Sequence, residues 1–174
     1  MNHDSAIYSI LIADDNPHNL KLLSTTLNCF GYDINVAIDG KTAIESAIAQ
    51  PPDLILLDVY MPEIDGFQAC KILKSDIRTK EIPVLLVSAF DDQNIKIKVF
   101  EVGATDYITK PIQIEEAKAR IDAHLKLKNK KSDISKINKV VVDREMRIIE
   151  LKKEINKLAY ESGIKEPYMD ISDN

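Results

Sequence analysis

The stretch LILLDVYMPEIDG, residues 54 to 66, places four aliphatic residues directly before Asp58 and follows it with a turn that holds a proline and a glycine. A continuous aliphatic run of this length is typical of a strand covered on both faces, as inner strands of parallel sheets are. An ionised carboxylate is costly to bury. Asp58, at the end of such a strand, is therefore the first candidate for a functional residue.

Four further strand-like segments occur, and helical patterns alternate with them. The strand-like segments cover 7–13, 32–38, 53–58, 83–89 and 106–110, and the helical patterns cover 17–30, 40–50, 66–75, 92–102 and a stretch after Pro111. Asn16, Asp39 and Asp65 stand where residues that cap a helix N-terminus are expected. The alternation predicts an α/β fold, a five-stranded parallel sheet with right-handed crossovers and helices on both faces.

Polar residues follow or end several of these strands. Asp14 and Asp15 follow the first strand, Asp58 ends the third, Ser88 lies near the end of the fourth and Lys110 ends the fifth. In open parallel sheets, ligands bind beyond the carboxyl ends of the strands. We therefore expect these five side chains to converge on one edge of the sheet.

Three crowded carboxylates repel one another, and a divalent cation is the usual remedy. Mg2+ prefers oxygen ligands and commonly uses one or two carboxylates together with a phosphate oxygen, which Asp15 and Asp58 can provide. No histidine or cysteine cluster accompanies them, so a zinc site is not expected. With charge neutralised, a carboxylate can attack a phosphoryl group, while Lys110 and Ser88 contact its oxygens.

The same residues carry a resemblance to a known family. The motifs ADDN (13–16), LLDVYMPEIDG (56–66), VSA (87–89) and GATDYITKP (103–111) resemble the receiver domain of two-component response regulators in order and spacing. The similarity covers roughly residues 7–127. It implies a flavodoxin-like, doubly wound (βα)5 fold with strand order 2-1-3-4-5.

The resemblance also implies roles for individual residues. Asp58 would be the phosphoacceptor, modified by a histidine kinase or a phosphotransfer protein. Asp15, Asp58 and the backbone carbonyl of Tyr60 would ligate Mg2+, with Asp14 acting through water. Lys110 would contact the phosphoryl group and precede a cis peptide bond to Pro111, and Ser88 would stand where Thr is commoner.

Three aromatic residues extend this expectation. Tyr107 occupies the family's aromatic switch position, so phosphorylation is expected to draw Ser88 inward and turn Tyr107 towards the core, reshaping the face made by the fourth helix, fifth strand and fifth helix. Tyr60 and Phe90 lie where the family often carries polar residues that position a hydrolytic water. We expect these two aromatic residues to tune the lifetime of the phosphorylated state and to lengthen it.

Composition and charge limit the other classes of function. The 174 residues contain 6% aromatics and no Trp, which leaves little for stacking on nucleic-acid bases. The N-terminal apolar run stops too early for a signal peptide or a membrane span. Cys29 and Cys70 are interpreted as buried free thiols of a reducing compartment. We expect a cytoplasmic protein that binds neither nucleic acid nor membrane directly.

The charge changes sign towards the C-terminus. Residues 1–127 hold 12 Lys and Arg against 19 acidic residues, and residues 128–174 hold 11 against 9. We therefore predict a receiver domain over 1–127, a helical, coiled-coil-like extension over 128–163 and a tail over 164–174. The linking segment 126–133 is highly charged and is expected to fray.

A heptad repeat runs through the predicted extension. Ile134, Val141, Ile148 and Ile155 repeat at its first position, and Ile137, Arg144, Leu151 and Leu158 follow three residues later. β-Branched residues at one position with mostly Leu or Ile at the other favour a parallel two-stranded coiled coil and hence a homodimer. The alternative is an amphipathic helix folded back on its own receiver. The charges beside the apolar positions do not decide between the dimer and the folded-back helix. Arg147 and Lys152, at facing edge positions, would repel across a parallel pair.

These features predict a phosphoacceptor signalling domain with limited self-catalysed phosphotransfer and dephosphorylation. A non-phosphorylated scaffold is a second reading. An aspartate-nucleophile phosphohydrolase is a third reading. It is weakened because such enzymes carry an Asp-x-Asp motif that begins with the nucleophile, and in this chain Tyr60 replaces the second Asp of that motif. No DNA-binding, cyclase or kinase domain fits in the last 47 residues. Output is expected through protein contacts or through domains beyond this chain.

Overall fold

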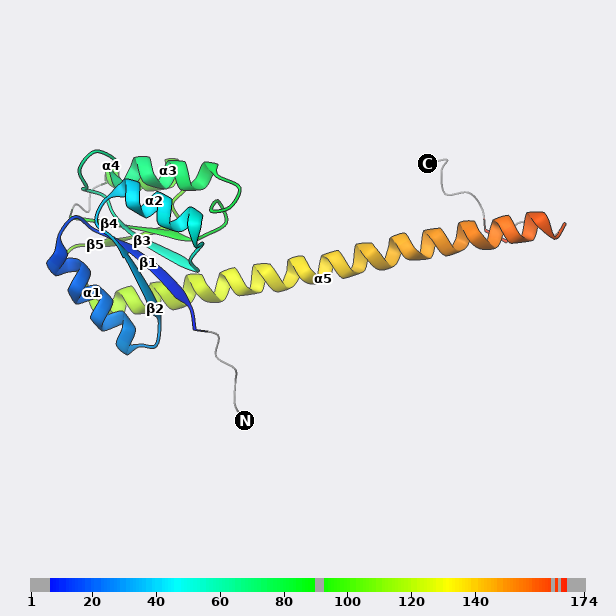
Figure 1. Cartoon of the computed structure of the whole chain (residues 1–174), viewed down its shortest axis with the longest axis horizontal. Coiled ribbons are helices and arrows are strands. Elements are labelled where there is room, and N and C mark those ends of the chain that lie inside the picture. The colour runs from blue at the N-terminus through cyan, green and yellow to red at the C-terminus, as the bar shows by residue number, and fades with distance from the viewer. Residues whose placement is uncertain (1–6, 90–92, 164, 166, 169–174) are drawn as a thin grey trace. The chain divides into compact units, whose positions relative to one another are not determined.

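The computed structural model describes residues 7–89, 93–163, 165, 167 and 168. Within them, five parallel strands form one sheet in the order β2-β1-β3-β4-β5, and this confirms the predicted fold (Figure 1). The strands are β1 (Ser9–Ala13), β2 (Asp33–Ala37), β3 (Leu54–Asp58), β4 (Val84–Ser88) and β5 (Asp106–Thr109). The helices are α1 (Pro17–Cys29), α2 (Gly40–Ala49), α3 (Gly66–Ser75), α4 (Gln93–Glu101) and α5 (Ile114–Glu161).

The sheet divides the core into two layers. Ile55 and Leu57 of β3 pack with residues of α2, α3 and α4 on one face, and Leu54 and Leu56 pack with α1 and the first turns of α5 on the other. This alternation follows from the two-residue period of a strand. All five residues of β3 are buried, so the aliphatic run fixes Asp58 between two packed layers.

Side chains in the loops before α1 and α2 cap the first turns of these helices, as the sequence predicts. Asn16 accepts a hydrogen bond from the His18 backbone N–H at 2.9 Å, and Asp39 accepts one from Thr42 at 2.7 Å. These bonds satisfy donors that a helix N-terminus leaves without intrahelical partners. Both loops follow strands, so the caps also fix the course of the chain at the carboxyl edge of the sheet.

Two predictions about α1 are wrong. Cys29 is exposed rather than buried, and Phe30, which the predicted helix over 17–30 includes, is 43% exposed and follows the end of the helix at Cys29. The buried face of α1 is made by Leu20, Leu23 and Leu27. Cys29 lies about 200° around the helix from Leu27, which points it to solvent.

Helix α5 continues through the charged segment 126–133, where fraying was expected. Its buried residues are Ala117, Ile121 and Leu125, all in the first turns. Backbone contacts group residues 1–128 and 129–174 as two compact units, while the domain limits at 127 and 163 stay a prediction. No helix in the described part of the chain is both long and apolar enough to cross a membrane.

Candidate functional site

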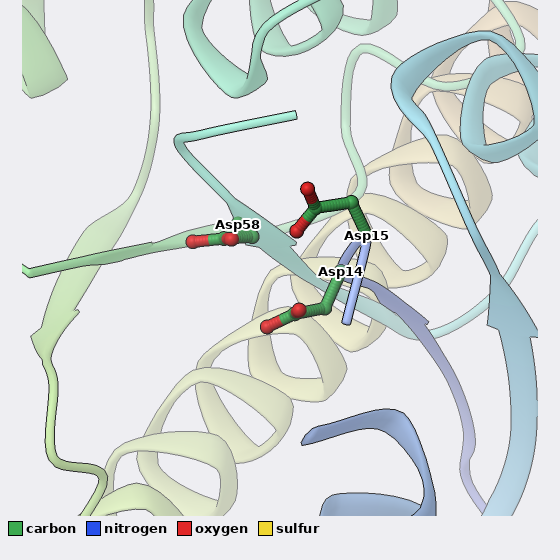
Figure 2. Close-up of side chains that lie close together, drawn as sticks. All are labelled: Asp14, Asp15 and Asp58. Carbon is green, nitrogen blue, oxygen red and sulfur yellow. The ribbon is translucent and has the colours of Figure 1, made fainter. Parts of the chain in front are cut away.

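The candidate site is a group of acidic side chains at the carboxyl edge of the sheet. Asp14 and Asp15 follow β1 and Asp58 ends β3, and one carboxylate oxygen of each lies within 4.8 Å of the others (Figure 2). Asp14 and Asp58 are 2% and 3% exposed, whereas Asp15 is exposed. Two buried carboxylates therefore line the site and a third opens it to solvent.

Lys110 provides the positive charge of this site. Its Nζ lies 3.0 Å from Asp14 Oδ2 and 3.0 Å from Asp58 Oδ2. Burial disfavours the charged form of Lys110, but its hydrogen bonds to the two carboxylates outweigh burial and raise the pKa of the ammonium. The Lys110 backbone N–H donates to the Ser88 carbonyl at 2.8 Å, and the Lys110–Pro111 peptide bond is cis.

Three groups donate hydrogen bonds to the Asp14 carboxylate. It accepts hydrogen bonds from the Asn16 backbone N–H at 2.8 Å and from Asn19 Nδ2 at 3.0 and 3.1 Å, in addition to Lys110. Asn19 was not among the residues singled out from the sequence. The only signal was a polar residue in the first turn of α1, on the side that faces the site.

Asp58 is less well satisfied than Asp14. Among the described residues, its Oδ1 is buried and has no hydrogen-bond partner. Burial raises the pKa of the Asp58 carboxyl, Lys110 opposes this shift, and the charges of Asp14 and Asp15 add to it. A buried carboxylate oxygen without a partner beside two further carboxylates fits a hard cation with oxygen ligands, such as Mg2+.

The loop after β3 is pressed against the backbone of Asp58. A Cβ on Gly66 would lie 2.2 Å from the Asp58 carbonyl oxygen, so only glycine fits there. The Gly66 N–H donates to the Val59 carbonyl at 2.9 Å, and Asp65 and Gln68 form a capping box that begins α3. This packing role of Gly66 was not anticipated, although an Asp-Gly pair is a known turn signal.

Three of the four residues expected to move or to screen the site lie within the described part of the chain. Ser88 is fully buried. Tyr107 is partly buried and packs against the core cluster beneath α2, α3 and α4. Tyr60 is 51% exposed, and Phe90 lies outside the described residues.

Fold and site together define a doubly wound α/β protein with an acidic, lysine-bearing pocket at the carboxyl edge of its sheet. The family model for the response regulator receiver domain matches residues 10–122, and the chain belongs to this family. Residues 10–122 contain the three acidic residues, Ser88 and Lys110. The resemblance seen in the sequence motifs is thereby confirmed.

Curated relatives include full regulators of several kinds. The DNA-binding dual master transcriptional regulator RpaA of Synechocystis is 44% identical over 117 residues, which are 67% of this chain and 48% of the relative. The response regulator PleD of Caulobacter vibrioides is 46% identical over 103 residues, which are 59% of this chain and 23% of the relative. The chain thus spans half or less of the length of these two proteins.

Solved structures of receiver domains share the fold. The receiver domain of the sensor histidine kinase PA1611 from Pseudomonas aeruginosa, solved with a magnesium ion in its active-site cleft, is 28% identical with a TM-score of 0.65. The alignment covers 69% of this chain and 98% of that one. The receiver domain of the Francisella response regulator 1452 is 34% identical with a TM-score of 0.64, covering 68% and 97%.

Proposed function

We propose that this chain is a phosphoacceptor of a two-component phosphorelay and that Asp58 receives the phosphoryl group from a histidine kinase or a phosphotransfer protein. The observation that carries the proposal is the environment of Asp58. One of its oxygens is buried without a partner and the other is 3.0 Å from Lys110. Such a carboxylate is rigidly positioned and faces a fixed positive charge.

The reaction follows from these positions. A carboxylate oxygen of Asp58 attacks phosphorus, the bond from phosphorus to the donor nitrogen breaks, and an acyl phosphate forms. Lys110 stabilises the negative charge on the phosphoryl oxygens, and the Ser88 hydroxyl donates a hydrogen bond to one of them. Because Asp14 also contacts Lys110 at 3.0 Å, it keeps the ammonium at the site while the charge on Asp58 changes.

Asp15, Asp58 and the backbone carbonyl of Tyr60 would hold Mg2+, with Asp14 acting through water. A bound divalent cation offsets repulsion between the incoming phosphoryl group and the carboxylates. The exposed position of Asp15 leaves its carboxylate accessible to a hydrated ion. The unpaired oxygen of Asp58 supports this assignment.

We further propose that Ser88 and Tyr107 carry the change to the face made by α4, β5 and α5. A phosphoryl group shifts this equilibrium only if it contacts one arrangement better, and the Ser88 hydroxyl is the group able to do so. Tyr107 is on the strand next to Ser88, so its ring can follow. A Tyr107→Ala variant that kept its phosphorylation-dependent partner binding would contradict this role.

Output is proposed to pass through protein contacts, including a homodimer formed by the C-terminal part of α5. Residues 129–174 form their own compact unit, and the match covers only 48% of the length of one relative and 23% of another. A signalling module of this kind acts on its partners through a surface rather than through its own catalysis.

Acetyl phosphate with Mg2+ provides the direct test. Intact-mass measurement is expected to show one added phosphoryl group on the wild type and none on Asp58→Asn. Asp53→Asn is the matched control, since Asp53 lies just before the other end of β3, and it should be modified like the wild type. Mg2+ should also raise the melting temperature of the wild type but not of Asp58→Asn. Absence of any Asp58-dependent modification would favour the scaffold reading.

A further inference from the structure

The second part of α5 carries an apolar seam that only Arg144 interrupts. The seam consists of Ile134, Ile137, Val141, Ile148, Leu151, Ile155 and Leu158. Each of these side chains is between 41% and 62% exposed. Apolar side chains that recur at this spacing need a partner surface, because leaving them in water is unfavourable.

We propose that a second copy of this chain covers the seam in antiparallel orientation, with Ile148 of one copy facing Leu151 of the other. The proposal rests on the homodimer in the proposed function and specifies its geometry. It departs from the parallel pair that the β-branched pattern favours. Charges along both edges of the seam decide between the two orientations.

A parallel pair places like charges together. Its facing edge positions would bring Arg147 of one copy to Lys152 of the other, on both sides of the pair. Arg144, the single polar breach of the heptad, would lie at the same level as Arg144 of the second copy. None of these contacts is attractive, so the charges oppose the parallel arrangement.

In an antiparallel pair, the edge positions that precede the first heptad position face each other, and so do the edge positions that follow the second apolar position. With Ile148 opposite Leu151, Arg147 lies next to Glu154 of the second copy and Glu145 lies next to Lys152 of the second copy. Each contact occurs twice by symmetry, which gives four attractive pairs. Arg144 is then separated from Arg144 of the second copy and faces Ile155 of the second copy.

The register is specified by the same charges. Sliding one helix by seven residues in one direction would bring Arg147 opposite Arg147, and sliding it in the other direction would bring Glu154 opposite Glu154. Within the described residues, Glu145 and Glu154 have no ion-pair partner in their own chain. The seam therefore favours one alignment among the three.

Contacts already present in the chain leave this surface accessible. Arg147 Nη1 lies 3.1 Å from Glu150 Oε2, an exposed pair that can be exchanged. Tyr168 is held by Asn156, whose side chain donates to the Tyr168 carbonyl at 2.7 Å and accepts from its N–H at 3.1 Å. Lys152 Nζ lies 5.4 Å from the Tyr168 ring centre, yet Ile155 remains 41% exposed.

A shallow hollow on the helix fits the incoming side chain. It has a volume of about 240 Å³ and is lined by Lys136, Ile137, Val140 and Val141. In the proposed register, Leu158 of the second copy faces Val141 and would insert there. Knobs of this size entering holes between four side chains are the usual packing of paired helices.

Disulfide trapping distinguishes the orientations. Val141→Cys and Leu158→Cys are made in a Cys29→Ser background, keeping the buried Cys70. In the antiparallel pair, a mixture of the two variants is expected to cross-link, whereas Leu158→Cys alone is not, because its two copies lie about 25 Å apart along the axis. Self-cross-linking of Leu158→Cys without the mixed product would overturn the proposal in favour of a parallel pair.

Charge reversal at Arg147 is an independent test, because it should weaken an antiparallel dimer and strengthen a parallel one. Arg147→Glu should weaken the antiparallel dimer roughly tenfold in sedimentation equilibrium, and adding Glu154→Arg to the same chain should restore it. In a parallel dimer, Arg147→Glu would face Lys152 and strengthen association. A monomer at all concentrations would also overturn the proposal. Repeating both tests with Asp58→Asn separates this result from the phosphoacceptor function, which the helix pairing does not require.

Discussion

Lys110 Nζ lies 3.0 Å from Asp58 Oδ2, and this contact joins the carboxyl ends of β5 and β3 across the intervening strand β4. The same ammonium also contacts Asp14. Lys110 thus contacts two of the three carboxylates of the site, and the pKa of Asp58 stays raised despite this partner. The acidic site is short of positive charge, which costs folding stability and favours cation binding.

Replacing Asp58 with Asn should stabilise the protein in EDTA. A carboxyl whose pKa is higher in the folded than in the unfolded state opposes folding increasingly as the pH rises between these two values, and fully above them. The free energy of unfolding of Asp58→Asn at pH 7.5 should therefore exceed that of the wild type, because burial raises the pKa of the Asp58 carboxyl. The difference should disappear near pH 3, where the wild-type carboxyl is protonated.

Urea denaturation at several pH values measures this difference. Asp133→Asn is a suitable control, because Asp133 is 70% exposed and lies outside the site. It should leave stability unchanged at both pH values. A destabilised Asp58→Asn at pH 7.5 would mean that the contact with Lys110 outweighs the burial of the carboxylate.

Gly66→Ala should destabilise the protein by about 2 kcal/mol or more. The new Cβ would lie 2.2 Å from the Asp58 carbonyl oxygen and 2.8 Å from Val59 Cα, so the β3 end or the loop must shift. Lys71→Ala, an exposed position on the same helix, should be nearly neutral in urea denaturation. Phosphorylation of Gly66→Ala by acetyl phosphate should slow as well, since the displaced backbone is that of Asp58. Wild-type stability in Gly66→Ala would show that this loop yields easily.

The two thiols should differ strongly in reactivity. Cys29 is exposed, whereas Cys70 is fully buried, with its Sγ 3.7 Å from the Val102 carbonyl. Burial raises the pKa of the Cys70 thiol to about 11, and the thiol form is the unreactive one. A colorimetric thiol reagent at pH 8 should therefore titrate one group in the native protein and two in denaturant. Cys29→Ser should abolish the native reaction, and rapid labelling of Cys70 would indicate local opening of α3.

Tyr60→Asn should shorten the life of the phosphorylated protein. An amide beside the acyl phosphate can orient a water for attack, whereas the half-exposed Tyr60 ring covers the group and offers little help to water. Loss of phosphoryl group after removal of acetyl phosphate, followed by intact mass, should be several times faster in the variant. Tyr60→Phe serves as the control and should stay close to the wild type. Equal rates in all three proteins would remove Tyr60 from this role.

The parallel sheet and the edge at which its polar residues meet were predictable from periodicity and chain direction, whereas the strand order was implied by the resemblance to receiver domains. Continuous aliphatic runs identify β3 and β4, and strands that run parallel bring Asp14, Asp58 and Lys110 to one edge whatever the details of packing. Helix caps were predictable for a similar reason, since Asn16 and Asp65 act on backbone groups a few residues away. These features are local in sequence or fixed by topology.

Other features depend on distances that a sequence does not state. The steric role of Gly66 requires knowledge of how closely the loop returns to β3, and the contact of Asn19 with Asp14 requires the tilt of α1. Cys29 and Phe30 were misplaced because the apolar stripe of α1 ends at Leu27. Continuity of α5 through its charged segment was missed because lysines there remain good helix formers.

The loop between Asp58 and Gly66 has a length fixed by the contacts at its two ends. Its two ends touch through the Asp58 carbonyl and the Gly66 backbone, and the Gly66 N–H closes the ring on Val59. Because this hydrogen bond closes the loop, inserting or deleting one residue would break the contact at one end of it. Single substitutions in the middle of this loop are therefore expected to be tolerated far better than any change in its length, so natural and designed variation here should alter side chains and leave the spacing intact.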